Sequence, residues 1–414
     1  MKMKETRKYK HMELGLLPED WEVVKLGDIG YFLKGNGISK SQANSGDLCA
    51  VRYGELYTLH HNYIKTYNSH ISKEVALFAT KIQKGDILFA CSGETKEEIG
   101  KCAAFVDEVE AYAGGDILIL RTDQEKCSDI FLGFLLNMPI AANQKAAKGQ
   151  GDAVVHISKA SLENLSIPLP PIEEQRRIAS ALTSIDNLID SLDRLIVKKR
   201  EIKQGAMQQL LSGKKRLKGF TEPWVEKKLG DMVETASGGT PLRSNIDYYK
   251  GHICWFTTSE LTDNYLYDSN EHITNEALSC SSAKLFPTGT LLIAMYGATI
   301  GRLGILCTEA ATNQACCAIN CQKIDTIFLF YLLLLNRPNI IELGCGAGQP
   351  NISQDIVKNL EFIVPSSLTE QQAISSVLTS MDNELSALEA KRKKYEQIKQ
   401  GIMQQLLTGR ISLN

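Results

Sequence analysis

The chain repeats itself, and this duplication constrains its fold more than any other feature. "WEVVKLGD" at 21–28 returns as "WVEKKLGD" at 224–231, and "KGDILFACSG" at 84–93 returns as "TGTLLIAMYG" at 288–297. The agreement is closest late in each copy, where "EQRRIASALTSIDN" and "IKQGAMQQLLSG" return as "EQQAISSVLTSMDN" and "IKQGIMQQLLTG". A repeat of this length predicts two units of one fold. Each copy has a long, diverged first part and a short, closely matching second part.

The matching parts are predicted to be long helices. Residues 174–212 hold no proline, and Gly213 and Gly409 stand where a helix should end. At 1.5 Å per residue each helix would be about 58 Å long. Its apolar residues follow a four-three spacing, which predicts a narrow seam that packs against a partner helix, the nearest being that of the other copy. The alternative is two separate amphipathic helices, each packed on its own domain. The seam residues are Ile178, Leu182, Ile185, Ile189, Leu192 and Ile196 in the first copy, and Ile374, Leu378, Met381, Leu385, Leu388 and Tyr395 in the second.

The diverged parts mix strands and helices. "DILFA", "DILIL", "HICWF" and "TLLIAMYG" predict strands, whereas "DIFLGFLLN" and "TIFLFYLLLLN" predict short helices. The fold class is therefore α+β, with two mixed α/β domains in tandem and approximate two-fold character. We divide the chain into a first domain at 1–170, a central helix at 171–213, a second domain at 214–366 and a C-terminal helix at 367–414.

Composition excludes several classes of protein. A net charge of -2 means that nucleic-acid binding would depend on local basic patches. The N-terminus has no apolar stretch typical of a secretory signal, and the longest apolar run, "IFLFYLLLL", is about half of a membrane span. We therefore expect a cytoplasmic protein without a membrane partner. The 11 cysteines include no C-x-x-C, which predicts free thiols and no metal site.

One stretch, "IELGCGAG" at 341–348, has the glycine pattern of a methyltransferase cofactor loop. Such a loop must follow a strand and open a helix, but here Gln349, Pro350 and Asn351 come next and only 66 residues remain after Gly348. The chain also has no phosphate-binding loop and no H-E-x-x-H. We therefore predict no catalytic, cofactor or metal residue.

The ordered motifs carry a family resemblance. "IPLPPIEEQRRIASAL", "IKQGAMQQLLSG", "SGGTPLRS", "GTLLIAMYGATIG", "ATNQACCAI", "EQQAISSVL" and "IKQGIMQQLLTG" together resemble the specificity subunit of Type I restriction-modification systems. The resemblance covers nearly the whole chain, although "SGGTP" has only "KGNGIS" as its counterpart in the first copy.

The resemblance implies a division of labour. Each domain would be a target-recognition domain that reads one half of a bipartite double-stranded DNA site. The two helices would form an antiparallel coiled coil that sets the gap and docks two modification (adenine methyltransferase) subunits. Those partners would hold S-adenosylmethionine, and restriction subunits, where present, would use ATP, so the chain itself would be non-catalytic. Two rival hypotheses are a stand-alone DNA-binding regulator and a self-contained methyltransferase.

Polar residues in glycine-bearing loops are the candidate DNA contacts. Arg can read guanine, Asn and Gln can read adenine, and Lys or Thr can hold phosphates. The alternative is that many of them are turn residues facing solvent. The candidates are Lys34, Asn36, Lys40, Arg52, Ser92, Thr95 and Lys96 in the first domain, and Thr240, Arg243, Tyr296, Thr299, Arg302, Asn313 and Gln314 in the second.

Overall fold

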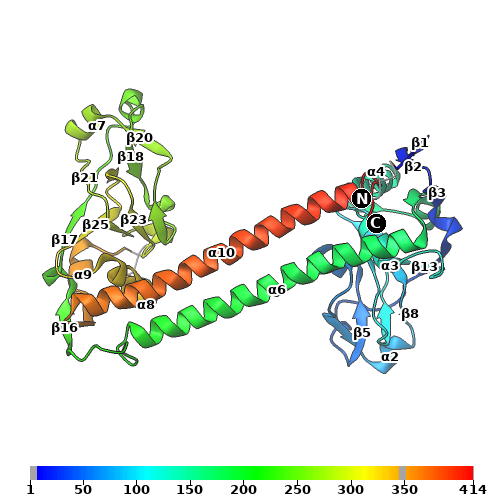
Figure 1. Cartoon of the computed structure of the whole chain (residues 1–414), viewed down its shortest axis with the longest axis horizontal. Helices are drawn as coiled ribbons and strands as arrows, with labels where there is room; N and C mark the ends of the chain where they lie inside the picture. The colour runs from blue at the N-terminus through cyan, green and yellow to red at the C-terminus, as the bar shows by residue number, and fades with distance from the viewer. Residues whose placement is uncertain (1–6, 345–350, 414) are drawn as a thin grey trace, which may run out of the picture. The chain divides into compact units, whose positions relative to one another are not determined.

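The computed structural model describes residues 7–344 and 351–413 (Figure 1). The chain forms two compact units, one made of Met1–Ser191 with Lys391–Asn414 and the other of Leu192–Ala390. Each unit therefore holds one mixed domain and half of each long helix. The sequence-based division at 170, 213 and 366 follows chain order instead, and it separates the helices from the domains on which they pack.

Both domains are built on a five-stranded and a four-stranded sheet with the same strand order. In each domain the two sheets contain one parallel pair apiece, and their other neighbours are antiparallel. The first domain has the orders β4 (Gly30–Lys34), β13 (Ile117–Thr122), β9 (Asp86–Ala90), β11 (Cys102–Ala104), β6 (Asn62–Tyr63), and β7 (Ser69–Ile71), β5 (Leu48–Val51), β12 (Ala111–Ala113), β8 (Thr80–Ile82). The second has β17 (Val233–Ser237), β25 (Cys316–Cys321), β22 (Leu291–Ala294), β23 (Leu303–Leu306), β19 (Asn264–Leu266), and β20 (Glu271–Ile273), β18 (Ile253–Phe256), β24 (Ala310–Thr312), β21 (Leu285–Phe286).

Smaller elements complete the two domains. Each has a two-stranded sheet that leads into its long helix, β3 (Glu22–Lys25) with β15 (Ser166–Leu169), and β16 (Trp224–Lys228) with β26 (Glu361–Pro365). The first domain adds β1 (Tyr9–Met12) with β2 (Gly15–Pro18), and β10 (Ser92–Gly93) with β14 (Val155–His156). The short helices are α1 (Tyr53–Thr58), α2 (Lys73–Ala76), α3 (Asp129–Leu135), α4 (Pro139–Lys148), α5 (Lys159–Glu163), α7 (Asn275–Ser279), α9 (Gln354–Lys358), and 3-10 turns at Leu26–Asp28, Leu229–Asp231, Ile246–Tyr249, Thr258–Glu260 and Gly297–Thr299.

The predicted strands lie at β9, β13, β18 and β22, and the first predicted short helix is α3. The second was predicted too short, because α8 spans Thr326–Leu343 and continues through Pro338. By length and composition α8 is the one helix among the described residues that could cross a membrane. Its aromatic and leucine residues instead pack in the second hydrophobic core, which gives this apolar helix a place inside the domain.

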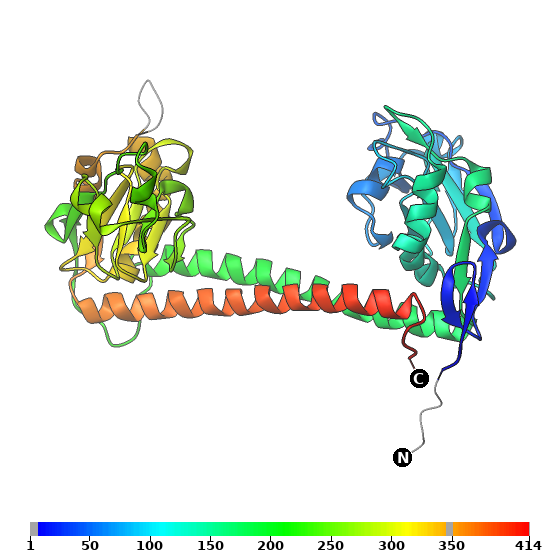
Figure 2. The same cartoon turned by 90° about the horizontal axis from the view of Figure 1, so that it is seen from above.

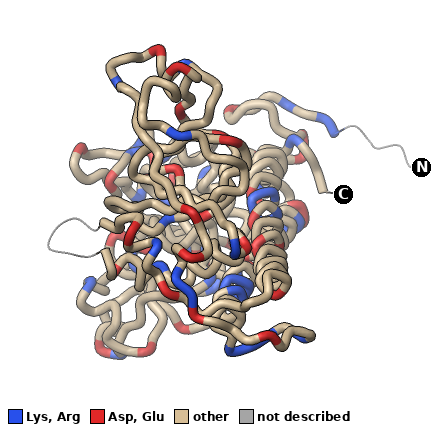
Figure 3. Tube along the Cα trace, turned by 90° about the vertical axis from the view of Figure 1, so that its left-hand side faces the viewer, with Lys and Arg blue, Asp and Glu red and all other residues tan. Residues whose placement is uncertain are grey.

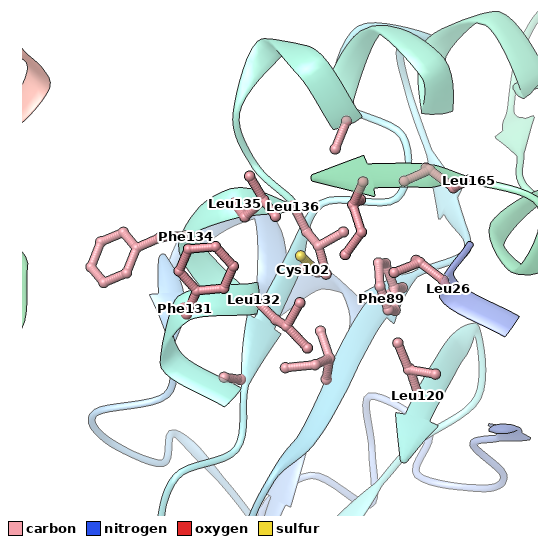
Figure 4. Packing of buried hydrophobic residues seen from close by; sticks show 14 of the residues in the cluster. Leu26, Phe89, Cys102, Leu120, Phe131, Leu132, Phe134, Leu135, Leu136 and Leu165 are labelled. Atoms are coloured by element: carbon pink, nitrogen blue, oxygen red, sulfur yellow. The ribbon is translucent and has the colours of Figure 1, made fainter. Parts of the chain in front are cut away.

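The core of the first domain lies between its five-stranded sheet and the helices beside it. Phe89, Cys102 and Leu120 come from β9, β11 and β13 and pack in one cluster with Leu132 and Leu135 of α3 (Figure 4). Phe89, Leu120 and Leu132 are fully buried. Because apolar area removed from water is the main favourable term in folding, this contact holds the sheet and α3 as one body.

The predicted long helices are α6 (Ile172–Leu210) and α10 (Leu368–Leu406) (Figure 1). Each has 39 residues and begins directly after its two-stranded sheet. Gly213 and Gly409 both have a φ of 69°, the left-handed conformation that ends helices and favours glycine. The sequence therefore placed both ends of each helix within a few residues.

Candidate nucleic-acid interface and helix pair

A reciprocal ion pair joins the two long helices inside each unit. In the second unit the Nζ of Lys203 lies 2.5 Å from the Oδ1 of Asp382, and in the first the Nζ of Lys399 lies 2.5 Å from the Oδ1 of Asp186. Lys203 and Lys399 occupy the same repeat position, as do Asp186 and Asp382. Each lysine thus contacts the aspartate of the other copy, an exchange that requires antiparallel helices (Figure 2).

An aromatic side chain of the adjoining domain completes each pair. The hydroxyl of Tyr331 donates to Asp382 at 2.6 Å, and that of Tyr63 donates to Asp186 at 3.3 Å. Burial, together with the neighbouring carboxylate, raises the pKa of both tyrosines, so both remain protonated donors. The polar groups therefore tie each domain to the helix pair as well as helix to helix.

The predicted seam is mostly inside the protein. Ile178 and Leu182 join the first core together with Leu406 and Leu407, while Ile374 joins the second. The ends of the helices thus pack on a domain and on the other helix at once, which combines the two alternatives drawn from the sequence. Buried seam residues are Ile178, Leu182, Ile189, Leu192, Ile196, Ile374, Leu378 and Leu385, and partly buried ones are Ile185, Met381, Leu388 and Tyr395.

A buried glutamate fixes the start of each long helix. Glu174 accepts two hydrogen bonds from Arg7, at 2.9 and 2.7 Å, and one from the Nε1 of Trp21 at 3.1 Å. Glu370 is fully buried and accepts the same set from Arg216 and Trp224. We call these two clusters the Arg-Glu-Trp latches. The sequence analysis did not identify them, although the repetition of Glu and Trp in both copies was a usable signal.

The next residue, a glutamine in both copies, binds backbone. Gln175 accepts from the amide of Ser128 and donates to the carbonyl oxygens of Lys126 and Pro170. Gln371 accepts from the amide of Asp325 in the same way. The "EQ" dipeptide therefore joins each helix to the N-terminus of a domain helix, α3 or α8.

The candidate DNA contacts of the first domain fall into two groups by exposure. Arg52 is half-buried at the start of α1, and Ser92 is buried with its Oγ 2.9 Å from the Nδ1 of His156. The hydroxyl of Ser92 is thus engaged within the domain. The other candidates are exposed, namely Lys34, Asn36, Lys40, Thr95 and Lys96.

In the second domain the structure brings some candidates together. The Oγ1 of Thr240 donates to Gln314 at 2.5 Å, so the loop after β17 lies against the loop after β24. Tyr296, Thr299 and Arg302 share the turn between β22 and β23, where the Oγ1 of Thr299 donates to the Tyr296 carbonyl oxygen. Of the whole set, Tyr296, Arg302, Thr240, Arg243 and Gln314 are exposed, and Thr299 and Asn313 are partly buried.

Arg243 is the most organised of these side chains. Its guanidinium donates to both carboxylate oxygens of Glu271, at 2.6 and 2.9 Å, and lies over the rings of Tyr249 and Trp255, at 4.4 and 4.8 Å. The hydrogen bond to Glu271 raises the pKa of Arg243. A stacked, permanently charged fork of this kind suits bidentate contact with a base or phosphate, provided that DNA displaces Glu271.

Charge is mixed over the surface of the second unit. Lys and Arg positions are interspersed with Asp and Glu positions over the loops and the helical segments (Figure 3). The basic run at 198–203 follows this pattern, because Lys199 pairs with Glu384 and Arg200 with Glu389. Part of the positive charge of this run is therefore used in ion pairs between the helices.

Residues 345–348 of "IELGCGAG" lie outside the described residues. The described part of the stretch, Ile341–Leu343, is the last turn of α8, and Gly344 follows as its cap. A methyltransferase loop is preceded by a strand. The helix thus removes the local context that the cofactor interpretation requires.

Comparison with known proteins agrees with this architecture. The family model of the Type I restriction modification DNA specificity domain matches residues 18–200 and again 221–400. A type I restriction enzyme specificity subunit (MjaVIII) of Methanocaldococcus jannaschii is 28% identical, over 97% of this chain and 96% of its own length.

Solved structures show the same fold. The S subunit of a Type I restriction-modification system from M. genitalium aligns with a TM-score of 0.61 at 16% identity, covering 93% of this chain and 96% of that one. A chain from a structure of the type I R-M system, described for its complex assembly and conformational transition, aligns with a TM-score of 0.59 at 19% identity, covering 95% and 99%. Since the family model matches most of the chain, in two copies that coincide with the duplication, the chain belongs to the family of Type I restriction-modification DNA specificity subunits.

Proposed function

We propose that this chain reads a bipartite, asymmetric DNA site, one half with each domain, and holds two modification subunits on its helix pair. The observation that carries the proposal is the contrast between the copies. Their sheets share one topology, but the loops at the candidate contacts differ, as "KGNGIS" and "SGGTPL" do. Two readers of one fold with different loops fit two different half-sites, whereas identical readers would require a palindrome.

The helices support docking of two copies of one partner. Ile202 and Ile398 occupy the same repeat position, and both are exposed, at 46% and 36%. An apolar side chain exposed at the same place in both copies offers the same contact twice. The partners in this proposal are adenine methyltransferase subunits that bind S-adenosylmethionine, joined by ATP-using restriction subunits where the system has them. The chain itself would act in the cytoplasm without catalysing a reaction.

Co-expression with the modification subunit of its own system tests the proposal. Methylated adenines are mapped over the host genome by single-molecule sequencing, with the modification subunit alone as control. A split motif with two defined halves around a fixed gap is the expected result. An undivided motif, or no methylation that depends on this chain, would refute the two-reader scaffold and favour a stand-alone DNA binder.

An Arg243→Ala variant sharpens the same experiment. Loss of the bidentate fork should relax or weaken recognition in one half of the motif and leave the other half intact, because Arg243 contacts only its own domain. Lys250→Ala, which removes an exposed cation paired with Asp247, is the matched control in the same domain. Equal effects of both variants on both halves would contradict independent reading.

A further inference from the structure

Three side chains of types that can ligate a metal ion lie close together in the second domain. The Sγ of Cys254 lies 3.7 Å from the Nε2 of His272 and 3.6 Å from the Oδ1 of Asp268, and that Oδ1 lies 2.8 Å from the same Nε2. Cys254 is on β18, His272 is on β20, and Asp268 precedes β20. This is the one three-ligand cluster found in the described ranges 7–344 and 351–413. The sequence analysis missed it because strand pairing, not C-x-x-C spacing, brings the ligands together.

The arrangement does not fit a proton relay. In a nucleophile–histidine–carboxylate relay the thiol and the carboxylate contact opposite ring nitrogens. Here both face Nε2, so the imidazole cannot pass a proton from one to the other. Three ligand atoms of different kinds that converge on one another instead suit a cation placed among them.

The distances agree with tetrahedral coordination. Zinc–sulfur bonds of about 2.3 Å and zinc–nitrogen or zinc–oxygen bonds of about 2.0–2.2 Å place sulfur about 3.6 Å from each lighter ligand, and nitrogen about 3.4 Å from oxygen. The two sulfur distances, 3.7 and 3.6 Å, already match. The nitrogen–oxygen distance must open from 2.8 Å, which a side-chain rotation of the exposed Asp268 allows.

The backbone holds the ligands in place. Cys254 and His272 are direct partners in the antiparallel pairing of β18 with β20. The Oδ1 of Asp268 also accepts from the amide of Ser269 at 2.9 Å, and the Ser269 hydroxyl donates to the Glu271 carbonyl oxygen at 2.6 Å. Cys254 is buried while Asp268 is open to solvent, so an ion has an entry path and room for a water ligand.

The duplication supplies an independent observation. In the first domain Cys49 and His70 are direct partners in the antiparallel pairing of β5 with β7, the strands equivalent to β18 and β20. The loops differ widely between the copies, yet both keep cysteine opposite histidine. Asn68 lies two residues before His70, whereas Asp268 lies four residues before His272, so the first domain has no carboxylate at the corresponding place. The first domain therefore has two of the three ligands.

We propose that Cys254, Asp268 and His272 bind one zinc-class divalent metal ion, with water as the fourth ligand. The metal–sulfur bond forms as the thiol of Cys254 releases its proton to solvent, with no change of oxidation state. The ion joins β18 to the turn before β20, and so holds Glu271, the partner of Arg243, in position. Metal binding at this site does not depend on the proposed function. Any effect of the metal ion on DNA recognition through Arg243 does rest on the proposed function.

Cobalt(II) is the probe, because its thiolate complexes absorb in the near ultraviolet. The full chain, freed of metal by a chelator, should bind one equivalent of Co²⁺ with this absorption, and zinc should displace it. Cys254→Ser and His272→Ala should abolish the signal, and Asp268→Asn should weaken binding by about tenfold or more. The matched controls are Cys280→Ser, an exposed cysteine of the same domain, and Cys49→Ser, and both should keep the wild-type signal.

The wild-type chain provides a second measurement in case a variant fails to fold. Zinc added to the chelated protein should raise its unfolding temperature in a concentration-dependent way, since a ligand that binds the folded state stabilises it. A wild-type chain that binds no Co²⁺ and shows no zinc-dependent shift overturns the proposal. So does an absorption that persists in folded Cys254→Ser and His272→Ala. DNA binding is assayed separately, so the metal-binding result can be interpreted even if the proposed function is wrong.

Discussion

The reciprocal ion pairs predict how the helix pair responds to a change in length. In α6, Asp186 and Lys203 are 203 - 186 = 17 residues apart, and in α10, Asp382 and Lys399 are 399 - 382 = 17 residues apart. The two spans must be equal for both pairs to form. A heptad inserted near Leu195 of α6 alone breaks this equality by about 10.5 Å, whereas a second heptad at the equivalent position of α10 restores it.

The geometry also sets the size of the effect on DNA. Seven residues lengthen a helix by about 10.5 Å, or about three base pairs at 3.4 Å each, and turn it by only about 20°. Three base pairs turn the duplex by about 100°. The inserted heptad turns the helix by much less than the added base pairs turn the duplex, so a domain must rotate further to stay on its half-site. Three base pairs is therefore an upper bound on the increase in the gap.

Methylation mapping with the co-expressed modification subunit is the assay. The double insertion should lengthen the gap by about one to three base pairs and leave both half-sites unchanged. The α6-only insertion should lose methylation and unfold at a lower temperature. An unchanged gap or altered half-sites in the double insertion would refute the modular reading, and equal behaviour of the single and double insertions would show that the ion pairs do not set the helix register.

Single side chains make three further predictions. Glu370→Gln should lower the free energy of unfolding by about 2 kcal/mol, because it weakens charge-assisted hydrogen bonds to a buried group, and an unchanged urea midpoint would show that the latch contributes nothing. Lys203→Asp should cost about 1 kcal/mol, since the pair with Asp382 is partly exposed, and adding Asp382→Lys should recover most of it, a recovery that a double-mutant cycle measures. Lys145 is buried, and its Nζ donates to the Gly100 carbonyl oxygen at 2.6 Å. Burial lowers the pKa of Lys145 below 10.5, so between the lowered pKa and 10.5 the folded chain binds fewer protons than the unfolded chain. The free energy of unfolding of the wild-type chain should therefore rise with pH in that range. Lys145→Met should remove this rise, which urea unfolding of both proteins over a pH series measures. The same dependence of the free energy of unfolding on pH in both proteins would contradict the prediction.

The parts of the fold that could be predicted from the sequence are those whose apolar residues recur at regular spacing or in both copies of the repeat. The four-three spacing from Ile178 to Ile196 located α6, and the repeat then located α10. The length of α8 was missed because a continuous apolar run has no helical period, and because Pro338 near its end normally argues for an earlier stop.

The candidate site was harder to predict because its contacts are made across the fold. Whether Ser92 faces solvent or His156 depends on the pairing of β10 with β14, and the pair Arg243–Glu271 depends on where β20 lies. Neither pairing has a local sequence signature. The Arg-Glu-Trp latches were detectable in principle, since Glu174 and Glu370 repeat, but the repeat alone does not say which partners they bind.

The contacts also give a physical reason why the two copies match in one part and differ in the other. The lysine of each helix pairs with the aspartate of the other, so a change of one partner mismatches its pair until the other helix changes as well, and the two helices are not free to change independently. The loop contacts of Arg243 and Thr240 stay within their own domain, so one domain can change its loops without disturbing the other. Under the proposed function, the same division would let this chain acquire a new half-site while it keeps the register of its helix pair.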